Sequence, residues 1–160
     1  LFEGAPEAGP RALGHRSLLF DPRNIKGKDI VNTLKNREWY RPFAPVVRLE
    51  DVSEYFEWEG ESKHMLYCPK VRKKWREKLS SITHIDDTAR VQTVTREQNE
   101  FLYDLITIFK EKSGHGVLLN TSFNIAGKPI LNTIADAVKV LEKTQMDYLI
   151  IEDFWYGKHW

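Results

Sequence analysis

Residues 117–124 read VLLNTSFN, a short apolar run that passes directly into polar residues. A run of this length between turn signals is typical of a buried strand. Asn120, Ser122 and Asn124 carry neutral donors and acceptors that can orient a small polar group. Ligands commonly bind where the strands of an α/β sheet end, so this stretch predicts one side of a binding site. The alternative is an ordinary polar turn whose side chains bond their own backbone.

Helical and strand-like segments alternate on both sides of this run. Before it, residues 97–112 have the apolar spacing of an amphipathic helix, with Gly114 as its stop. After it, Thr133 is expected to cap a second helix, supported by Asp136. Residues 148–153, YLIIED, and the aromatic residues that follow predict a strand or hairpin. This alternation predicts an α/β or α+β domain with a mixed sheet.

The first half of the chain contributes further expected elements. Strands are predicted for VVRL at 46–49, for HMLYC at 64–68 and, as two strands joined at Asp86 and Asp87, for ITHIDDTARVQTV at 82–94; short helices are predicted at 28–36 and 51–56. The basic run KVRKKWREK, 70–78, is compatible with either a helix or an exposed loop. We find no internal repeat and no low-complexity segment.

Three cations stand close together in KNREWYRPFAP, residues 35–45. The helix predicted at 28–36 places Lys35 and Arg37 at its C-terminal end, and Arg41 follows shortly after them in the sequence. Arginine forks suit bidentate contacts with anionic oxygens, and clustered cations repel one another unless an anion satisfies them. The run therefore predicts a second half-site, for phosphoryl and acyl-phosphate oxygens.

The alternative is that these cations are surface charges. Lys35 and Arg37 would then be solvated, and Arg41 would pair with Glu38 or Glu50. Two prolines at 42 and 45 favour the binding interpretation, because a stiff backbone lowers the entropy cost of presenting Arg41.

Arg90 is a conditional fourth cation. It lies at an expected strand start, where its side chain points to the opposite face from those of its neighbours. If that face is the pocket, Arg90 joins the site; if it is solvent, Arg90 pairs with Asp86 or Asp87. His84 and Asp86 share a face of one expected strand, but two ligand-type residues do not make a metal site, and a structural histidine is the favoured interpretation.

Composition excludes several classes of protein. The chain has 160 residues, of which 41% are hydrophobic and 29% charged, as in ordinary globular domains. A single cysteine, Cys68, excludes an internal disulfide framework and a cysteine-based zinc site, and we expect a cytoplasmic protein. The net charge of +1 is not that of a polyanion binder, although residues 70–78 hold six cations and one tryptophan. A nucleic-acid contact there is the alternative to a solvated face.

Residues 1–24 are rich in turn formers and read as a linker or interdomain crossing at the end of a longer polypeptide. Within this segment GPRALGHRS, 9–17, carries Arg11, His15 and Arg16. Its glycines permit close approach of the backbone to a ligand or a partner domain. The alternative is an ordinary basic linker.

Five spaced motifs resemble a known family. In chain order they are GPRALGHRSLLFDPR at 9–23, KNREWYRPFAPVV at 35–47, THIDDTARVQTV at 83–94, LLNTSFNIAGKPI at 118–130 and DYLIIEDF at 147–154. Together they resemble the C-terminal region of the nodulation-protein and antibiotic-pathway O-carbamoyltransferases. The resemblance runs over nearly the whole chain.

The resemblance implies a YrdC-like domain at 25–160, a twisted mixed sheet with flanking helices and a cationic concave pocket. Residues 1–24 would be the end of a missing N-terminal domain of the actin and sugar-kinase type. The expected substrates are carbamoyl phosphate and ATP, the latter with Mg²⁺, and the product is carbamoyl adenylate. The N-terminal domain, with its own metal, would pass the carbamoyl group to an acceptor hydroxyl. No cofactor metal site, membrane contact or nucleic-acid partner is expected for this chain.

The resemblance also assigns roles to residues. Lys35, Arg41 and Arg90 match the family's anion-binding cations and are the expected catalytic residues. Arg11, Arg37, Asn120, Ser122 and Asn124 are the expected contacts to carbamoyl phosphate and ATP. His15 departs from the asparagine that is frequent in the family. A YrdC-type domain that makes threonylcarbamoyl adenylate for tRNA shares the KxR and SxN elements, but the GPRALG and DDTARVQTV motifs argue against it.

Overall fold

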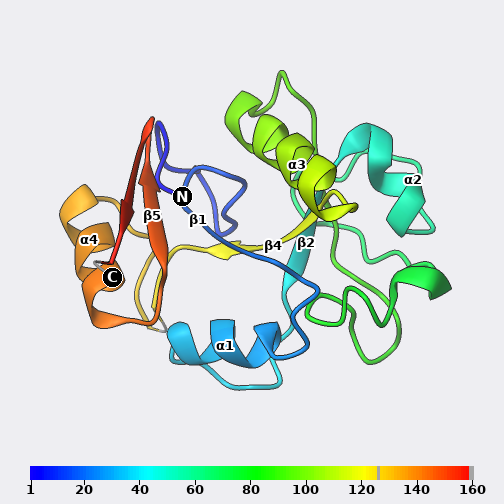
Figure 1. Ribbon diagram of the computed structural model, residues 1–160, viewed down its shortest axis with the longest axis horizontal. Helices are drawn as coiled ribbons and strands as arrows, with labels where there is room; N and C mark the ends of the chain where they lie inside the picture. Colours follow the sequence, from blue (N-terminus) through cyan, green and yellow to red (C-terminus); the bar gives the residue numbers. More distant parts are fainter. Residues whose placement is uncertain (126, 159–160) are drawn as a thin grey trace.

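The computed structural model describes residues 1–125 and 127–158 and has a four-stranded sheet at its centre (Figure 1). The strands lie in the order β1 (Ser17–Phe20), β4 (Val117–Ser122), β2 (Ala44–Arg48) and β3 (Gln92–Val94). β4 pairs antiparallel with β1 and β2, and β2 pairs parallel with β3. The α+β class with a mixed sheet, as expected from the sequence, is confirmed.

β4 separates two apolar cores. Val117 and Leu119 contribute to the larger core, whereas Leu118, on the opposite face, packs with Leu102 and Ile106. This alternation follows from the two-residue period of a strand, and burial of both faces explains why the run is continuously apolar. The predicted strand is confirmed, and it extends into the polar residues as far as Ser122.

Helix α3 (Glu100–Ser113) covers one face of the sheet (Figure 1). Asn99 caps its first turn by accepting a hydrogen bond from the backbone N–H of Leu102 at 2.8 Å. Gly114 ends the helix in the left-handed conformation, with φ of 79°. The predicted helix and its glycine stop are confirmed.

The described residues also contain three shorter helices. They are α1 (Gly27–Leu34), α2 (Val52–Tyr55), which follows the 3₁₀ turn η1 (Leu49–Asp51), and α4 (Ile134–Lys143). α4 is capped by Thr133, whose hydroxyl accepts from the N–H of Asp136 at 3.2 Å, as the sequence predicts. α1 ends at Leu34, just before Lys35, which confirms the expected position of Lys35 at the C-terminal end of a helix.

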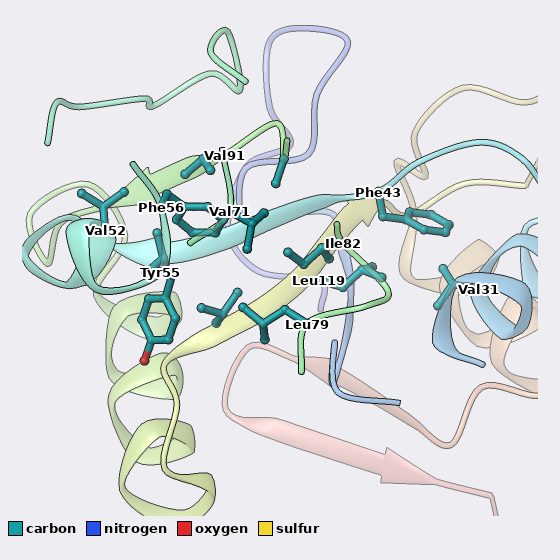
Figure 2. Close-up of a cluster of buried hydrophobic side chains, with 13 residues drawn as sticks. Val31, Phe43, Val52, Tyr55, Phe56, Val71, Leu79, Ile82, Val91 and Leu119 are labelled. Atoms are coloured by element: carbon teal, nitrogen blue, oxygen red, sulfur yellow. The ribbon is translucent and has the colours of Figure 1, made fainter. Parts of the chain in front are cut away.

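The larger core holds the irregular region 57–91 against the sheet (Figure 2). Phe56, Leu79 and Ile82 are almost completely buried in it. Tyr55 is also buried, and its hydroxyl accepts a hydrogen bond from the N–H of Gly116 at 2.8 Å. Burial of such side chains contributes about 1.5 to 3 kcal/mol each, which orders a segment with little secondary structure.

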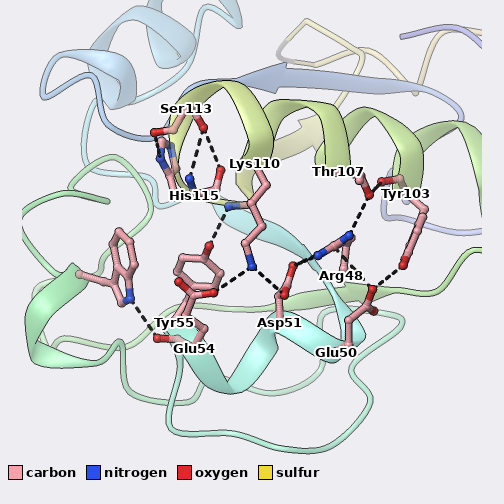
Figure 3. Close-up of polar contacts among 12 residues, drawn as sticks. Arg48, Glu50, Asp51, Glu54, Tyr55, Tyr103, Thr107, Lys110, Ser113 and His115 are labelled. Atoms are coloured by element: carbon pink, nitrogen blue, oxygen red, sulfur yellow. Dashed lines mark hydrogen bonds and ion pairs between the residues drawn. The ribbon is translucent and has the colours of Figure 1, made fainter.

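An ionic network joins α3 to the α2 region (Figure 3). Lys110 of α3 contacts Asp51 at 2.8 Å and Glu54 at 3.0 Å, and Asp51 also accepts from Nε of Arg48 at 2.7 Å. Asp51 is mostly buried and shared by two cations, so this network is less screened by solvent than a surface pair.

The C-terminal strands β5 (Tyr148–Ile151) and β6 (Phe154–Gly157) form an antiparallel hairpin, as the sequence predicts. Phe2 runs beside β5 and donates its N–H to the carbonyl of Ile150 at 2.8 Å. α4 packs on the same hairpin (Figure 1). The N-terminal and C-terminal residues that are described thus lie side by side.

Two predicted strands are wrong. Residues 64–68 make only a single bridge, from Tyr67 to Val91, and the first strand expected within 82–94 is a turn, with Asp87 at a φ of 65°. The basic run 70–78 contains a short 3₁₀ turn, η2 (Lys73–Trp75). The apolar residues of this region enter the core singly from loops, so their spacing imitates strand periodicity without a partner strand.

Part of the turn-rich segment 1–24 lies within the central sheet, because β1 is formed by Ser17–Phe20. The division between domains at residue 24 stays a prediction. No described helix is long and apolar enough to cross a membrane.

Gly14 gives a test of how tightly the N-terminal segment packs. Its φ is 120°, and a Cβ atom there would lie 2.7 Å from both the Asn99 amide nitrogen and a Leu102 methyl carbon. We expect Gly14→Ala to lower the free energy of unfolding by about 2 kcal/mol, measured by urea denaturation, because the substitution adds strain and a clash.

Gly9→Ala is the matched control. Its φ is not positive and no atom lies within 4 Å of the added methyl position, so the change should stay within about 0.5 kcal/mol. Equal stability of the two variants would contradict the packing described for Gly14.

Candidate functional site

A cavity of about 400 Å³ opens beside the C-terminal end of β4. All eight residues predicted for the site line it: Arg11, Lys35, Arg37, Arg41, Arg90, Asn120, Ser122 and Asn124. None of the described residues that line it is aspartate or glutamate. We call this space the cationic cavity. The two half-sites predicted from separate parts of the sequence therefore meet in the fold.

Lys35 connects the two halves. It is only 3% exposed, and its Nζ donates to the backbone carbonyls of Ser122 and Asn124, the latter at 3.1 Å. Nζ also lies 2.7 Å from Oδ1 of Asn124 and 3.3 Å from the Ser122 hydroxyl. The ammonium thus fixes the shape of the polar turn after β4. The alternative of a solvated helix-end charge is wrong for Lys35.

Burial, followed by the neighbouring charges of Arg37 and Arg41, lowers the pKa of Lys35 to about 7. Four oxygen atoms around Nζ act against this, because an ammonium can donate three hydrogens and a neutral amine only two. The charge of Lys35 is therefore sensitive to pH near neutrality and to any anion that enters the cavity.

Arg37 is held in place from two sides. Its Nε donates to Oδ1 of Asn32 at 2.6 Å, and its guanidinium lies 4.2 Å from the centre of the Phe43 ring. Burial, followed by Arg41 and Arg90, lowers the pKa of Arg37 to about 10. Arg37 stays charged at neutral pH, and the charge of Glu38 offsets only part of these effects.

Arg41 lies at the exposed rim of the cationic cavity. Its nearest carboxylate is Glu38 at 3.6 Å, and both side chains are more than half exposed. An exposed pair of this kind contributes about 1 kcal/mol or less, so Glu38 holds Arg41 only weakly. The sequence suggested Glu38 or Glu50 as the partner of Arg41. In the structure Arg41 contacts Glu38, whereas Glu50 contacts Arg48.

Arg90 faces the cationic cavity, and the solvent-facing alternative is wrong. Asp87 pairs instead with Arg76 at 2.6 Å, and Asp86 accepts from Thr88. Burial and the nearby Arg11 lower the pKa of Arg90. Its Nε is buried and has no hydrogen-bond partner among the described residues. Nε of Arg90 is therefore a buried donor that an acceptor atom of a ligand could satisfy.

Asn120 is 1% exposed and is oriented by a residue that the sequence analysis did not identify. Its Nδ2 donates to Oε1 of Gln92 at 2.7 Å and to the carbonyl of Ala12 at 3.1 Å. Gln92, 2% exposed, in turn donates to the carbonyl of Leu13 at 3.0 Å. The available signal was a polar amide within a strand whose other residues are buried.

The loop that carries Arg11 is shaped by Glu7, a second residue that the sequence analysis missed. Oε1 of Glu7 accepts from the backbone N–H groups of Leu13 at 2.6 Å and His15 at 2.9 Å. Arg16 lies away from the cationic cavity: it donates to backbone carbonyls at 2.8 Å and stacks on Phe2. Arg16 is therefore a structural residue, whereas Arg11 reaches the site.

A larger cavity of about 710 Å³ adjoins the cationic cavity and shares Pro10 and Arg11 with it. Its remaining lining includes the apolar side chains of Leu13, Leu66 and Val94. The two cavities thus place a cationic space beside one whose surface is mostly apolar.

Two other sequence features contribute nothing to this site. His84 contacts the Thr88 hydroxyl at 3.0 Å, and no group of three or more metal-ligating side chains occurs among residues 1–125 and 127–158. In the basic run 70–78, Arg72 donates to Ser53 and Arg76 pairs with Asp87. Several of these cations are thus used within the fold.

The lowered pKa of Lys35 predicts a pH dependence of anion binding. Sulfate stays a dianion across the neutral range, so its affinity should fall as the pH rises above about 7 and Lys35 loses its proton. The unfolded chain keeps that proton up to the ordinary pKa of 10.5, so this group should also make the free energy of unfolding rise with pH between these values. Titration calorimetry with sulfate from pH 5.5 to 8.5 measures the first effect.

Lys35→Met should remove this pH dependence, whereas Lys139→Met, at an exposed position on α4, should retain it. An unchanged pH profile in Lys35→Met would show that another group titrates.

Comparison with known proteins places this chain in a family. The family model for the carbamoyltransferase C-terminus matches residues 1–158. The chain is 44% identical over 156 residues to nodulation protein NolNO of Sinorhizobium fredii, covering 95% of this chain and 23% of that protein. It is 42% identical over 156 residues to 3'-hydroxymethylcephem-O-carbamoyltransferase of Streptomyces clavuligerus, covering 98% of this chain and 30% of that protein.

Nodulation protein NolO of Bradyrhizobium diazoefficiens is 43% identical over 156 residues, covering 95% of this chain and 28% of that protein. The chain thus spans less than a third of the length of these relatives. Its five motifs, their order and the extent of the match lead to one conclusion: this chain belongs to the carbamoyltransferase C-terminal family.

Proposed function

We propose that the cationic cavity binds carbamoyl phosphate and ATP and makes carbamoyl adenylate. The observation that carries this proposal is the convergence of five cations on one small cavity without a lining carboxylate. Such a cluster is unfavourable unless an anion enters it. The family relationship makes an acyl phosphate a suitable anion.

The proposed chemistry has two steps. Hydrolysis of carbamoyl phosphate releases phosphate and carbamate, and a carbamate oxygen then attacks the α-phosphorus of ATP as pyrophosphate leaves. Both steps move negative charge among phosphoryl oxygens, so fixed cations can stabilise the transition states without a covalent nucleophile. Lys35, Arg41 and Arg90 are the proposed catalytic residues, and Arg11 and Arg37 bind the phosphates.

ATP needs more room than the cationic cavity offers, and the adjoining larger cavity supports its binding. Arg11 borders both spaces and is suited to the polyphosphate between them. Mg²⁺ would be held by the phosphates of ATP and by water, as is common for this ion. The side chains of Asn120 and Ser122 in β4, and of Asn124 just after it, would orient the carbamoyl group.

We further propose that transfer of the carbamoyl group to an acceptor hydroxyl needs a preceding actin-like domain. The support is that the matched relatives are more than three times the length of this chain and that one of them is named as an O-carbamoyltransferase. The proposed compartment is the cytoplasm, where ATP is abundant and the exposed thiol of Cys68 stays reduced.

Exchange of labelled pyrophosphate into ATP tests the proposal. Exchange should require carbamoyl phosphate, and Lys35→Ala or Arg41→Ala should reduce its rate at least about tenfold, the equivalent of roughly 1.4 kcal/mol of transition-state stabilisation. Lys139→Ala, which changes an exposed lysine outside the cavity, is the control.

Undiminished exchange in both cavity variants would remove Lys35 and Arg41 from the mechanism. Exchange that depends on bicarbonate and threonine in place of carbamoyl phosphate would instead identify a threonylcarbamoyl-adenylate enzyme. Salt-sensitive RNA binding that is lost on neutralising Lys73, Lys74 and Arg76 would reveal an RNA-binding module.

A further inference from the structure

Among the described residues, the cationic cavity is lined by one unsatisfied buried acceptor and one unsatisfied buried donor. Oδ1 of Asn120 is buried and has no hydrogen-bond partner among the described residues, although Asn120 lines the cavity. Nε of Arg90, which also lines it, is a buried donor in the same condition. Buried polar atoms without partners are rare and costly. A ligand that satisfies both atoms must bring an N–H or O–H donor together with its anionic oxygens.

The direction of the Asn120 amide is set by its neighbours. Nδ2 donates to Oε1 of Gln92 and to the carbonyl of Ala12, so a flipped amide would bring Oδ1 against two acceptor oxygens. Gln92 cannot flip with it, because its own Nε2 donates to the carbonyl of Leu13. Amide orientations are assigned from hydrogen-bond networks, and here the partners of the two amides fix the orientations of both Asn120 and Gln92.

Gln92 itself makes no contribution to the lining of the cationic cavity among the described residues. Its side chain is 2% exposed, and both of its polar atoms are used, one toward Leu13 and one toward Asn120. It lines the adjoining larger cavity, but it can influence a ligand in the cationic cavity only through Asn120. Without its acceptor oxygen the Asn120 amide would lose one of the two contacts that hold Nδ2 away from the ligand.

We propose that Gln92 is a positioning residue that locks the Asn120 amide with its oxygen toward the ligand and thereby selects a carbamoyl group over an acetyl group. This inference rests on the proposed function. Carbamoyl phosphate and acetyl phosphate have nearly the same shape, but the former carries an NH₂ donor where the latter carries a methyl group. Only the carbamoyl group can satisfy the Asn120 oxygen, and a site built to hydrogen-bond a ligand discriminates strongly against an analogue without that hydrogen.

Titration calorimetry with freshly dissolved carbamoyl phosphate, acetyl phosphate and inorganic phosphate tests this selection. The unmodified chain should bind carbamoyl phosphate at least about tenfold more tightly than acetyl phosphate. Gln92→Met, which keeps the length of the side chain but removes both polar atoms, should reduce that preference to less than about threefold while inorganic phosphate affinity changes less than twofold.

Two further variants separate positioning from a general loss of structure. Gln92→Glu retains an oxygen that accepts from Asn120, so it should keep the preference for carbamoyl phosphate even if all three anions bind more weakly. Gln145→Met makes the same chemical change at an exposed position outside the site and should leave all three affinities unaltered. If Gln92→Met does not fold, equal selectivity in Gln92→Glu and the unmodified chain supports the proposal, and lost selectivity overturns it.

The outcomes also distinguish this inference from the function on which it rests. Tight binding of carbamoyl phosphate with its preference intact in Gln92→Met would overturn the role of Gln92 and leave the proposed function standing. Equal binding of carbamoyl and acetyl phosphate by the unmodified chain would overturn the selection. Failure of the unmodified chain to bind carbamoyl phosphate would overturn both.

Discussion

The hydrogen bonds from Lys35 join two parts of the chain that lie 87 to 89 residues apart, the end of α1 and the turn after β4. A buried ammonium is costly unless its hydrogens are accepted, and here the acceptors are backbone and side-chain oxygens of Ser122 and Asn124. None of these acceptors carries a formal charge. The ammonium is therefore solvated by the protein without being neutralised, and its positive potential remains available to the cavity.

Carboxylate groups are also absent from the rest of the described lining of the cavity. Elsewhere in the fold, the partly buried cations Lys110 and Arg48 share a carboxylate partner in Asp51. In the cavity, Lys35 and Arg37 are held instead by amide groups, an aromatic ring and carbonyl groups. Burial, and after it mutual repulsion, lowers the pKa of Lys35 and Arg37 and opposes folding of the empty site. Departures of this kind from electrostatic optimisation are expected at functional sites, where an anion restores the balance.

The sequence predicted those parts of the molecule in which local chemistry and global packing agree. Strand β4, helix α3 with its Gly114 stop and the cap at Thr133 are of this kind, because each is encoded by period or by a single capping residue. The region 57–91 was not predictable, since its apolar residues are anchored one at a time by tertiary contacts. For the site, charge and spacing identified the cations. Gln92 was not identified, because its role depends on its contact with Asn120, which lies 28 positions away in the sequence.

The N-terminal loop shows why such partners act as one unit. Glu7 accepts hydrogen bonds from the N–H groups of Leu13 and His15. In the loop held in this way, the carbonyls of Ala12 and Leu13 point toward the side-chain amides of Asn120 and Gln92. Those carbonyls are the acceptors that fix the orientation of the buried amides, and the same loop carries Arg11 to the border of both cavities. A change in loop shape would therefore move a cation and release an amide together. Gly14 closes this loop against Asn99 and Leu102, where no side chain fits. The backbone of the loop, more than any single side chain in it, couples the packing of α3 to the polarity of the cavity.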